Sequence, residues 1–361
     1  MKRTESDQEA EMDTFPRFKA TVVQAAPVWL DREATTEKAC RFIAQAGAEG
    51  SRLIAFPEAW LPGFPWWIFL GTPAWGNSLF AELYANSVEI PSPTTEKLCA
   101  AAREAGIYVV MGIDERAGSS LYCTQLFIDA GGGIMGRHRK LKPTHVERSV
   151  WGEGDGSDLR VFDTPLGKIG GLNCWEHLQP LTRYAMYSLG QQIHIASWPA
   201  FSMYRKQSFA LGAVASVGAT RHYALEGGCF ALMAVSLISE DMLARIADTA
   251  ERADLVEAGG GASQIFGPDG ATIAGPLGDD EEGLVTAEID LYDIARAKNF
   301  ADPVGHYSRP DVFRLFVNRA PQLRVQEVTP EASASAVWSS AHQAWDPAAD
   351  NLQERALEGS S

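Results

Sequence analysis

Four residues of the sequence could take part in catalysis and occupy positions at which their side chains could be accessible to a substrate. Cys174 and Glu58 each follow an apolar run, and Lys140 and Lys142 lie in a basic one. A cysteine thiolate is a strong nucleophile. A carboxylate in apolar surroundings has a raised pKa and can act as a base near neutral pH. A lysine ammonium can stabilise negative charge that develops during a reaction.

The position of Cys174 differs from that of the other four cysteines. An isolated cysteine is most often a buried packing residue. Cys174 ends the small and apolar strand of "KIGGLNCWEH", where a sharp strand-to-helix turn would expose its thiol and leave backbone N–H groups free to bind an oxyanion. The other cysteines fall inside expected helices or strands: Cys40, Cys99, Cys123 and Cys229. Cys174 is therefore the candidate nucleophile.

Two kinds of partner could activate this thiol. A histidine could form a pair with it, and His177, His194 and His222 are available. A carboxylate and a lysine could do the same work, with Glu58 taking the thiol proton. A lone glutamate is usually a solvated turn residue, but four aromatic residues follow this one in "PEAWLPGFPWW".

The basic stretch "RHRKLK" also has two interpretations. Lysine on an edge strand blocks sheet aggregation, and a catalytic lysine would occupy the same stretch. Lys140 and Lys142 share one face of an extended strand, so their spacing does not choose between them.

The elements that must position these residues alternate between apolar strands and helices. This pattern, with both hairpins and strand–helix units, predicts a mixed-sheet, layered α/β fold over residues 18–320. Residues 1–17 are expected to form a flexible N-terminal arm. Residues 321–361 are expected to form a C-terminal tail that is disordered or takes part in oligomer contacts. Strands are expected at 19–28, 52–56, 107–115, 120–129, 133–140, 159–173 (a hairpin), 193–198, 228–237, 263–275 and 283–290, and helices at 33–50, 95–106, 180–190, from the end of strand 193–198 to Arg221, and at 292–300.

Composition and motifs exclude several classes of protein. The net charge of −15 argues against nucleic acid and anionic membrane as partners, because polyanion binding needs a basic face. No apolar run reaches the roughly 18 residues of a membrane span, and the charged N-terminus has no secretory h-region. Five scattered cysteines without a C-x-x-C pair favour a reducing cytoplasm over disulfides or a zinc site. "GGGIMG" (131–136) matches a dinucleotide motif, but the extended segment after it favours a hairpin turn.

Three separated motifs resemble those of the nitrilase superfamily of carbon–nitrogen hydrolases. They are "FPEAWLPGFPWW", "RKLKPTHVERSVWGEGDGS" and "NCWEHLQPL", and they occur in that family's order. The resemblance covers about residues 18–320, includes "DPVGHYSRPDV", and is strongest to the nitrilase branch. It implies a catalytic triad of Glu58, Lys140 and Cys174, with Lys142 at a variable position. It also implies that Glu147 is a second carboxylate that orients the lysine or water, and it favours a structural role for His177.

The resemblance further implies an activity. Such an enzyme hydrolyses an organic nitrile to a carboxylic acid and ammonia through a thioimidate and then a thioester on Cys174, with no cofactor or metal. The implied fold is an α-β-β-α sandwich whose dimers stack into four layers and grow into spiral homo-oligomers. An aromatic pocket would favour aryl or arylaliphatic nitriles, although several of these aromatic residues could equally be core. The pocket candidates are Trp60, Trp67, His145, Trp175, Trp198 and Phe201.

Two alternatives stay open at this point. Cyanide hydratases and dihydratases share these motifs, as would an amide-releasing relative. A non-catalytic, filament-forming scaffold could also keep the fold, although all three triad positions are intact.

Overall fold

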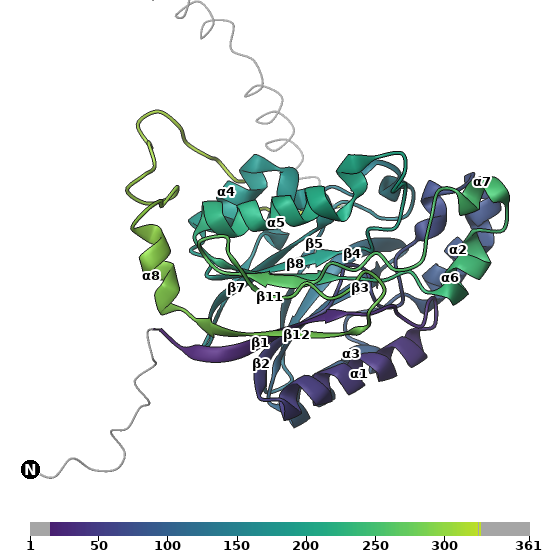
Figure 1. Cartoon of the computed structure of the whole chain (residues 1–361), viewed down its shortest axis with the longest axis horizontal. Helices are drawn as coiled ribbons and strands as arrows, with labels where there is room; N and C mark the ends of the chain where they lie inside the picture. The colour runs from purple at the N-terminus through teal and green to yellow at the C-terminus, as the bar shows by residue number, and fades with distance from the viewer. Residues whose placement is uncertain (1–14, 324, 326–361) are drawn as a thin grey trace, which may run out of the picture. The chain divides into compact units, whose positions relative to one another are not determined.

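The computed structural model describes residues 15–323 and residue 325 (Figure 1). The chain divides into the units Met1–Ala320 and Pro321–Ser361, and every element described below belongs to the first. The expected arm at 1–17 and tail at 321–361 lie outside the described residues, apart from 15–17, 321–323 and 325.

The first sheet has six strands in the order β12-β1-β2-β3-β4-β5. β1, β2 and β3 are parallel, and the other neighbours are antiparallel. The hairpin from β4 to β5 contains the glycine-rich stretch, so its interpretation as a turn is confirmed. The strands are β1 (Arg17–Gln24), β2 (Ser51–Ala55), β3 (Tyr108–Ala117), β4 (Ser120–Ile128), β5 (Ile134–Arg139) and β12 (Gly283–Asp290).

The second sheet repeats this pattern with the order β11-β10-β9-β8-β7-β6. Here β7, β8 and β9 are parallel, and antiparallel strands flank them on both sides. The strands are β6 (Val161–Thr164), β7 (Gly167–Asn173), β8 (Ile193–Trp198), β9 (Phe230–Val235), β10 (Gln264–Phe266) and β11 (Thr272–Ala274).

Helices cover the outer face of each sheet. α1 (Arg32–Ala48) and α3 (Pro93–Ala105) lie on the first sheet, and α4 (Pro180–Ser188) and α5 (Ala213–Gly227) lie on the second (Figure 1). This is the α-β-β-α arrangement that the resemblance implied. Further helices that sequence periodicity did not reveal are α2 (Pro73–Asn86), α6 (Glu240–Ile246) and α7 (Ala250–Ala253), whereas α8 (Tyr292–Lys298) was expected.

The core between the sheets is apolar on both sides. Alternate residues of β1 and β2, such as Val22 and Leu53, pack in one cluster with Ile195 and Leu232 of the second sheet. β8 and β9 are buried on both faces, which accounts for the mostly apolar sequence of β8 and the wholly apolar sequence of β9. One expected helix was too long: the chain after β8 forms a loop with a short 3-10 turn, and α5 begins only at Ala213.

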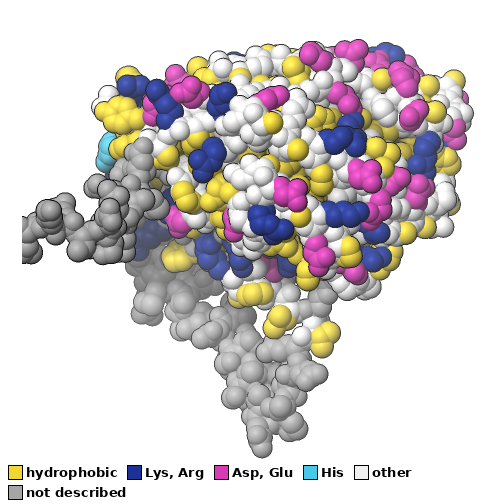
Figure 2. Space-filling view, turned by 90° about the horizontal axis from the view of Figure 1, so that it is seen from below, with side chains coloured by type: hydrophobic (Ala, Val, Ile, Leu, Met, Phe, Trp, Pro, Cys, Tyr) yellow, Lys and Arg dark blue, Asp and Glu magenta, His cyan; other side chains and the backbone are white. Residues whose placement is uncertain are grey.

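The outer face of the first helical layer is polar and mixed in charge. Figure 2 shows acidic and basic side chains interspersed, with hydrophobic side chains scattered between them. An ion pair of 2.6 Å between Lys97 and Glu33 joins α3 to α1. In the part of the chain that the structure describes, no helix has the length and apolar character needed to cross a bilayer.

Gly112 of β3 allows the segment that carries Glu58 to pass over the sheet. A Cβ atom at Gly112 would overlap the carbonyl oxygen of Pro57. We expect Gly112→Ala to destabilise the fold by about 2 kcal/mol because a packed backbone must move, and to lower activity roughly 100-fold because Glu58 moves with it. Thermal unfolding and turnover measure the two effects. Gly218→Ala in α5, where the added Cβ meets open space, is the control that should keep both.

Candidate active site

The three proposed catalytic residues each follow the end of a strand, and the two sheets share them. Glu58 comes three residues after β2, and Lys140 comes directly after β5 of the same sheet. Cys174 comes directly after β7 of the second sheet. The backbone N–H of Glu58 bonds the carbonyl of Trp198 at the end of β8 (3.4 Å), which ties the two sheets together at this point.

Lys140 lies between two carboxylates. Its Nζ is 2.7 Å from Glu58 Oε1 and 2.6 Å from Glu147 Oε2, and all three side chains are buried. Glu147 Oε2 also accepts the backbone N–H of Thr144 (2.7 Å), so the short 3-10 helix at His145–Ser149 holds this carboxylate in place. Lys140 was the lysine favoured over Lys142, which instead pairs with Glu153 at the surface.

Cys174 is the first residue of a 3-10 helix, Cys174–Leu178, and its own backbone lies in the left-handed region. Its φ is 47°, a conformation that non-glycine residues adopt at a cost and that often marks functional sites. The Cys174 Sγ and one carboxylate oxygen each of Glu58 and Glu147 lie within 4.8 Å of one another. The backbone N–H of Trp175, the next residue, faces Sγ closely enough to oppose the rise of the thiol pKa.

The charges of the site define its resting state. Burial raises the pKa of Glu58 to about 7 even though Lys140 opposes the shift. Burial alone would lower the pKa of Lys140, but Glu147 and Glu58 outweigh it and raise that pKa well above its ordinary value. Burial and the charge of Glu58 raise the pKa of Cys174 well above its ordinary value. Near neutral pH the site therefore holds a thiol, an ammonium and a carboxylate that can accept a proton.

One oxygen of Glu58 has the freedom that a base needs. Oε1 accepts hydrogen bonds from Lys140 and, at 3.3 Å, from the Cys123 thiol. Oε2 is buried, and within the described part of the chain it has no hydrogen-bond partner. Leaving a buried carboxylate oxygen without a partner costs stability, so each such oxygen calls for a functional explanation. Accepting the Cys174 proton is such a purpose.

A metal ion does not fit this cluster. Glu58, Glu147 and Cys174 are spaced as ligands could be, but the ammonium of Lys140 already lies within hydrogen-bond distance of both carboxylates. A cation placed there would meet that positive charge at short range.

A cavity of about 400 Å³ opens onto Cys174 and Glu147. Of the pocket residues expected from the sequence, it is lined by His145, Trp175, Trp198 and Phe201. It is also lined by aromatic and apolar residues that were not singled out as pocket walls: Phe64, Trp66, Ile68, Phe69, Met203 and Tyr204. The wall of the cavity is therefore mostly apolar.

Trp60 and Trp67 do not line this cavity, so the prediction that they form its wall is wrong. Trp60 is fully buried in the core beside Phe56, and its indole N–H bonds the carbonyl of Ala25 (2.7 Å). Trp67 lines a neighbouring cavity instead. Sequence proximity to Glu58 suggested both, but the chain turns sharply after Glu58 and directs Trp60 into the core.

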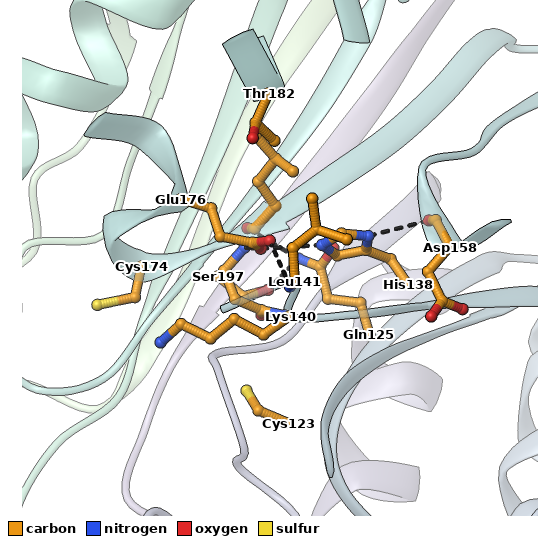
Figure 3. A network of polar contacts seen from close by, with 12 residues as sticks. Cys123, Gln125, His138, Lys140, Leu141, Asp158, Cys174, Glu176, Thr182 and Ser197 are labelled. Atoms are coloured by element: carbon orange, nitrogen blue, oxygen red, sulfur yellow. Dashed lines mark hydrogen bonds and ion pairs between the residues drawn. The ribbon is translucent and has the colours of Figure 1, made fainter. Parts of the chain in front are cut away.

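A buried carboxylate that sequence analysis did not single out ties two of the catalytic strands together. Glu176 accepts the backbone N–H groups of Leu141 (2.9 Å) and Asn173 (2.8 Å) and contacts His138 Nε2 (2.9 Å). Figure 3 shows this network beside Lys140 and Cys174. Because Leu141 and Asn173 adjoin Lys140 and Cys174, Glu176 fixes the spacing between the ammonium and the thiol. The sequence signal that could have identified Glu176 is its position two residues after Cys174.

Cys123 was also missed, because a cysteine inside a strand usually only packs. Its thiol donates to Glu58, and its carbonyl accepts the backbone N–H of Lys140 (2.8 Å). Burial raises its pKa well above the ordinary value, so the group remains a protonated donor.

Comparison with known proteins identifies the family of the chain. The family profile described as "Carbon-nitrogen hydrolase" matches residues 19–299. The chain belongs to the carbon–nitrogen hydrolase family. Within this family it is similar to nitrilases: it is 49% identical over 304 residues to a nitrilase of Pseudomonas syringae pv. syringae (strain B728a), covering 84% of this chain and 90% of that protein.

Two further relatives have names that point to different substrates. An aliphatic nitrilase of Rhodococcus rhodochrous is 50% identical over 303 residues, covering 84% of this chain and 83% of that protein. A protein of Alcaligenes faecalis named "Nitrilase, arylacetone-specific" is 44% identical over 329 residues, covering 89% and 92%.

Solved structures of the family share the fold. The Caenorhabditis elegans NitFhit protein superposes with a TM-score of 0.64 at 20% identity, covering 84% of this chain and 67% of that one. The carbon–nitrogen hydrolase of Helicobacter pylori G27 gives the same score and identity, covering 82% and 97%.

Proposed function

We propose that this protein is a nitrilase that hydrolyses an aryl or arylaliphatic nitrile to the carboxylic acid and ammonia. The observation that carries the proposal is the buried cluster of Glu58, Lys140 and Cys174, whose cysteine lines an aromatic cavity. A nitrile carbon is a weak electrophile, so a strong nucleophile with a nearby base suits it.

In the first stage, the thiol of Cys174 adds to the nitrile. Glu58 Oε2 accepts the thiol proton, the sulfur–carbon bond forms as one C–N π bond breaks, and Glu58 passes the proton on to the nitrogen. The product is a thioimidate on Cys174. Lys140 and the N–H of Trp175 stabilise the charge that builds on nitrogen, and removal of one such donor lowers kcat by about 10²–10³.

In the second stage, two waters complete the hydrolysis. Glu58 takes a proton from the first water as its oxygen adds to the thioimidate carbon, and it returns that proton to the nitrogen. The added hydroxyl loses its own proton to the nitrogen as the carbon–nitrogen bond breaks, so that ammonia leaves and a thioester remains. A second water then releases the carboxylic acid and restores the thiol. Glu147 contributes by holding Lys140 at 2.6 Å, so that the ammonium faces the reacting atoms. No step needs a cofactor.

The preference for an aryl group is supported by the cavity. Its volume of about 400 Å³ and its aromatic wall suit a flat apolar substituent, which buries its area there without leaving polar groups unpaired. Cyanide would leave most of this wall without contact. The names of the relatives include both aliphatic and arylacetone-specific nitrilases, so the cavity is the basis of the preference.

The test is a panel of phenylacetonitrile, a short aliphatic nitrile and cyanide, assayed for ammonia, acid and amide. We expect kcat/KM for phenylacetonitrile to exceed that for the aliphatic nitrile by about tenfold or more, since each additional buried methylene-sized group contributes 1–3 kcal/mol. Acid should be the main product. A preference for cyanide, or amide as the main product, would favour the hydratase or amide-releasing alternative. Inactivity on all members would favour the scaffold.

The pH dependence should report the base. Glu58 must be deprotonated to accept the thiol proton, and its pKa is raised to about 7. Activity is therefore present above that pKa and lost as pH falls through it. We expect kcat/KM to fall tenfold per pH unit on the acid side of pH 7. An acid limb near pH 4.5 would show that Glu58 titrates as an ordinary glutamate and is not the base.

We also propose that the protein forms homodimers that extend into larger spiral oligomers in the cytoplasm. Apolar side chains on the second helical layer support a partner there, since Leu181 of α4 is 68% exposed and Val214 of α5 is 70% exposed. Cysteine usage supports the compartment. The proposed role of the tail in assembly concerns residues outside the described part of the chain.

A further inference from the structure

Four buried side chains form a hydrogen-bonded chain that ends at the nucleophile. His177 Nδ1 lies 2.5 Å from the carbonyl oxygen of Cys174, and His177 Nε2 lies 2.8 Å from His194 Nε2. His194 Nδ1 lies 3.0 Å from Gln191 Nε2, and Gln191 Oε1 lies 2.5 Å from the hydroxyl of Tyr223. The mechanism above uses none of these four side chains, and all are buried.

The carbonyl group at one end of this hydrogen-bonded chain fixes which atoms carry the protons. A carbonyl oxygen only accepts, so His177 Nδ1 carries the proton that faces Cys174. In a neutral imidazole the other nitrogen then accepts, so His194 Nε2–H donates to His177 Nε2. His194 Nδ1 is left as an acceptor for the Gln191 amide, whose oxygen accepts the Tyr223 hydroxyl. Every donor points toward Cys174.

The environment keeps both imidazoles neutral, as this order requires. Burial lowers the pKa of His177 to about 4, although its bond to the Cys174 carbonyl opposes the shift. Burial and the neighbouring His177 lower the pKa of His194 well below its ordinary value. Neither ring gains a charge near neutral pH, so the direction of the chain is preserved.

The carbonyl that receives this chain belongs to the same peptide group as the N–H of Trp175. That N–H opposes the rise of the Cys174 thiol pKa and is the backbone donor of the proposed mechanism. A hydrogen bond to the oxygen of an amide polarises the group and strengthens its N–H as a donor, and bonds in a row reinforce one another.

We propose that Tyr223, Gln191, His194 and His177 polarise the Cys174–Trp175 peptide and so strengthen the Trp175 N–H toward charge that develops on the substrate. The inference rests on the proposed function for its substrate. His177 touches the nucleophile only through the backbone, so it is a positioning residue. The same bond supports the left-handed backbone of Cys174.

Three variants remove parts of the chain. His177→Leu removes the donor to the carbonyl. His177→Asn keeps an N–H near the position of Nδ1 but loses the contact with His194. Tyr223→Phe removes only the first hydroxyl, at the far end. The matched control is Tyr187→Phe, which removes another buried tyrosine hydroxyl. That hydroxyl bonds Glu226 (2.9 Å) and lies 3.5 Å from the backbone carbonyl of Tyr223, but it bonds no side chain of the four.

The measurements are kcat and KM for phenylacetonitrile and the inhibition constant of phenylacetaldehyde. The Cys174 sulfur adds to the carbonyl carbon of the aldehyde, the thiol proton goes to Glu58, and negative charge is left on the aldehyde oxygen. The affinity of the aldehyde therefore reports the strength of the hydrogen-bond donors directly. We expect His177→Leu to lower kcat and weaken aldehyde inhibition roughly 10- to 100-fold, less than complete loss of one donor. KM should stay within about twofold.

The smaller changes decide between polarisation and mere packing. We expect His177→Asn to recover much of the loss, and Tyr223→Phe to lower kcat and aldehyde affinity together by about two- to fivefold, while Tyr187→Phe changes neither. Equal behaviour of the two tyrosine variants, or of the two His177 variants, would overturn the proposal. If His177→Leu does not fold, the other variants still decide. A wild-type protein inactive on every nitrile would refute the proposed function, whereas aldehyde affinity would still test the chain.

Discussion

Cys174→Ala is expected to remove nitrile hydrolysis while leaving the fold intact. The substitution takes away the only atom that bonds the substrate in the proposed mechanism, and loss of a nucleophile lowers kcat by at least about 10⁴-fold in comparable enzymes. The Cys174 side chain is small and faces the cavity, with 7% of the residue exposed. Its loss should therefore leave thermal stability within about 1 kcal/mol.

The measurement is ammonia release under single-turnover and steady-state conditions, with intact and peptide mass spectrometry of the quenched wild-type protein. An adduct should be found on the peptide that contains Cys174. Cys40→Ala, the same change on a half-buried helical cysteine, should keep full activity. An adduct on Cys123 or Cys229, or normal rates in Cys174→Ala, would mean that the nucleophile is misassigned.

Glu58→Gln is expected to lower kcat/KM by roughly 10³- to 10⁴-fold, because it removes the base at both stages. The amide has nearly the same shape, and its oxygen can still accept the hydrogen bonds of Lys140 and Cys123. The fold should therefore persist. The residual rate should also lose the acid limb near pH 7, because no group with the raised pKa of Glu58 remains.

Glu153→Gln is the matched control. It makes the same change on a surface glutamate that pairs with Lys142, and activity should stay within twofold of wild type. A residual rate in Glu58→Gln that kept the acid limb would assign that limb to another group.

Much of the fold could be predicted because the pattern is local. The apolar runs of β2, β8 and β9 and the amphipathic sequences of α1 and α3 are sufficient to identify those elements. α2 was not seen, because its sequence "PAWGNSLFAELYAN" places aromatic residues around the helix and buries only a narrow stripe. The segment before α5 is a loop and not the expected helix, and several of its apolar residues form part of the cavity wall.

Only part of the candidate site could be predicted from the sequence alone. The catalytic positions could be proposed from strand ends and motif order, since neither depends on knowing the distances. The pocket wall could not: Trp60 stands two residues after Glu58 and yet packs in the core, whereas Met203 and Tyr204 come from a distant loop. Cys123 and Glu176 act through contacts between strands that only folding brings together.

The nucleophile belongs to one sheet, and the base and the ammonium belong to the other. Laboratory evolution of this protein should consequently find its tolerated changes of substrate range in residues 64–69 and 199–211, which shape the opening without carrying the reacting groups. Substitutions in the buried core between the sheets should be recovered rarely, however far they lie from the opening, because a shift there misaligns the thiol with its proton acceptor.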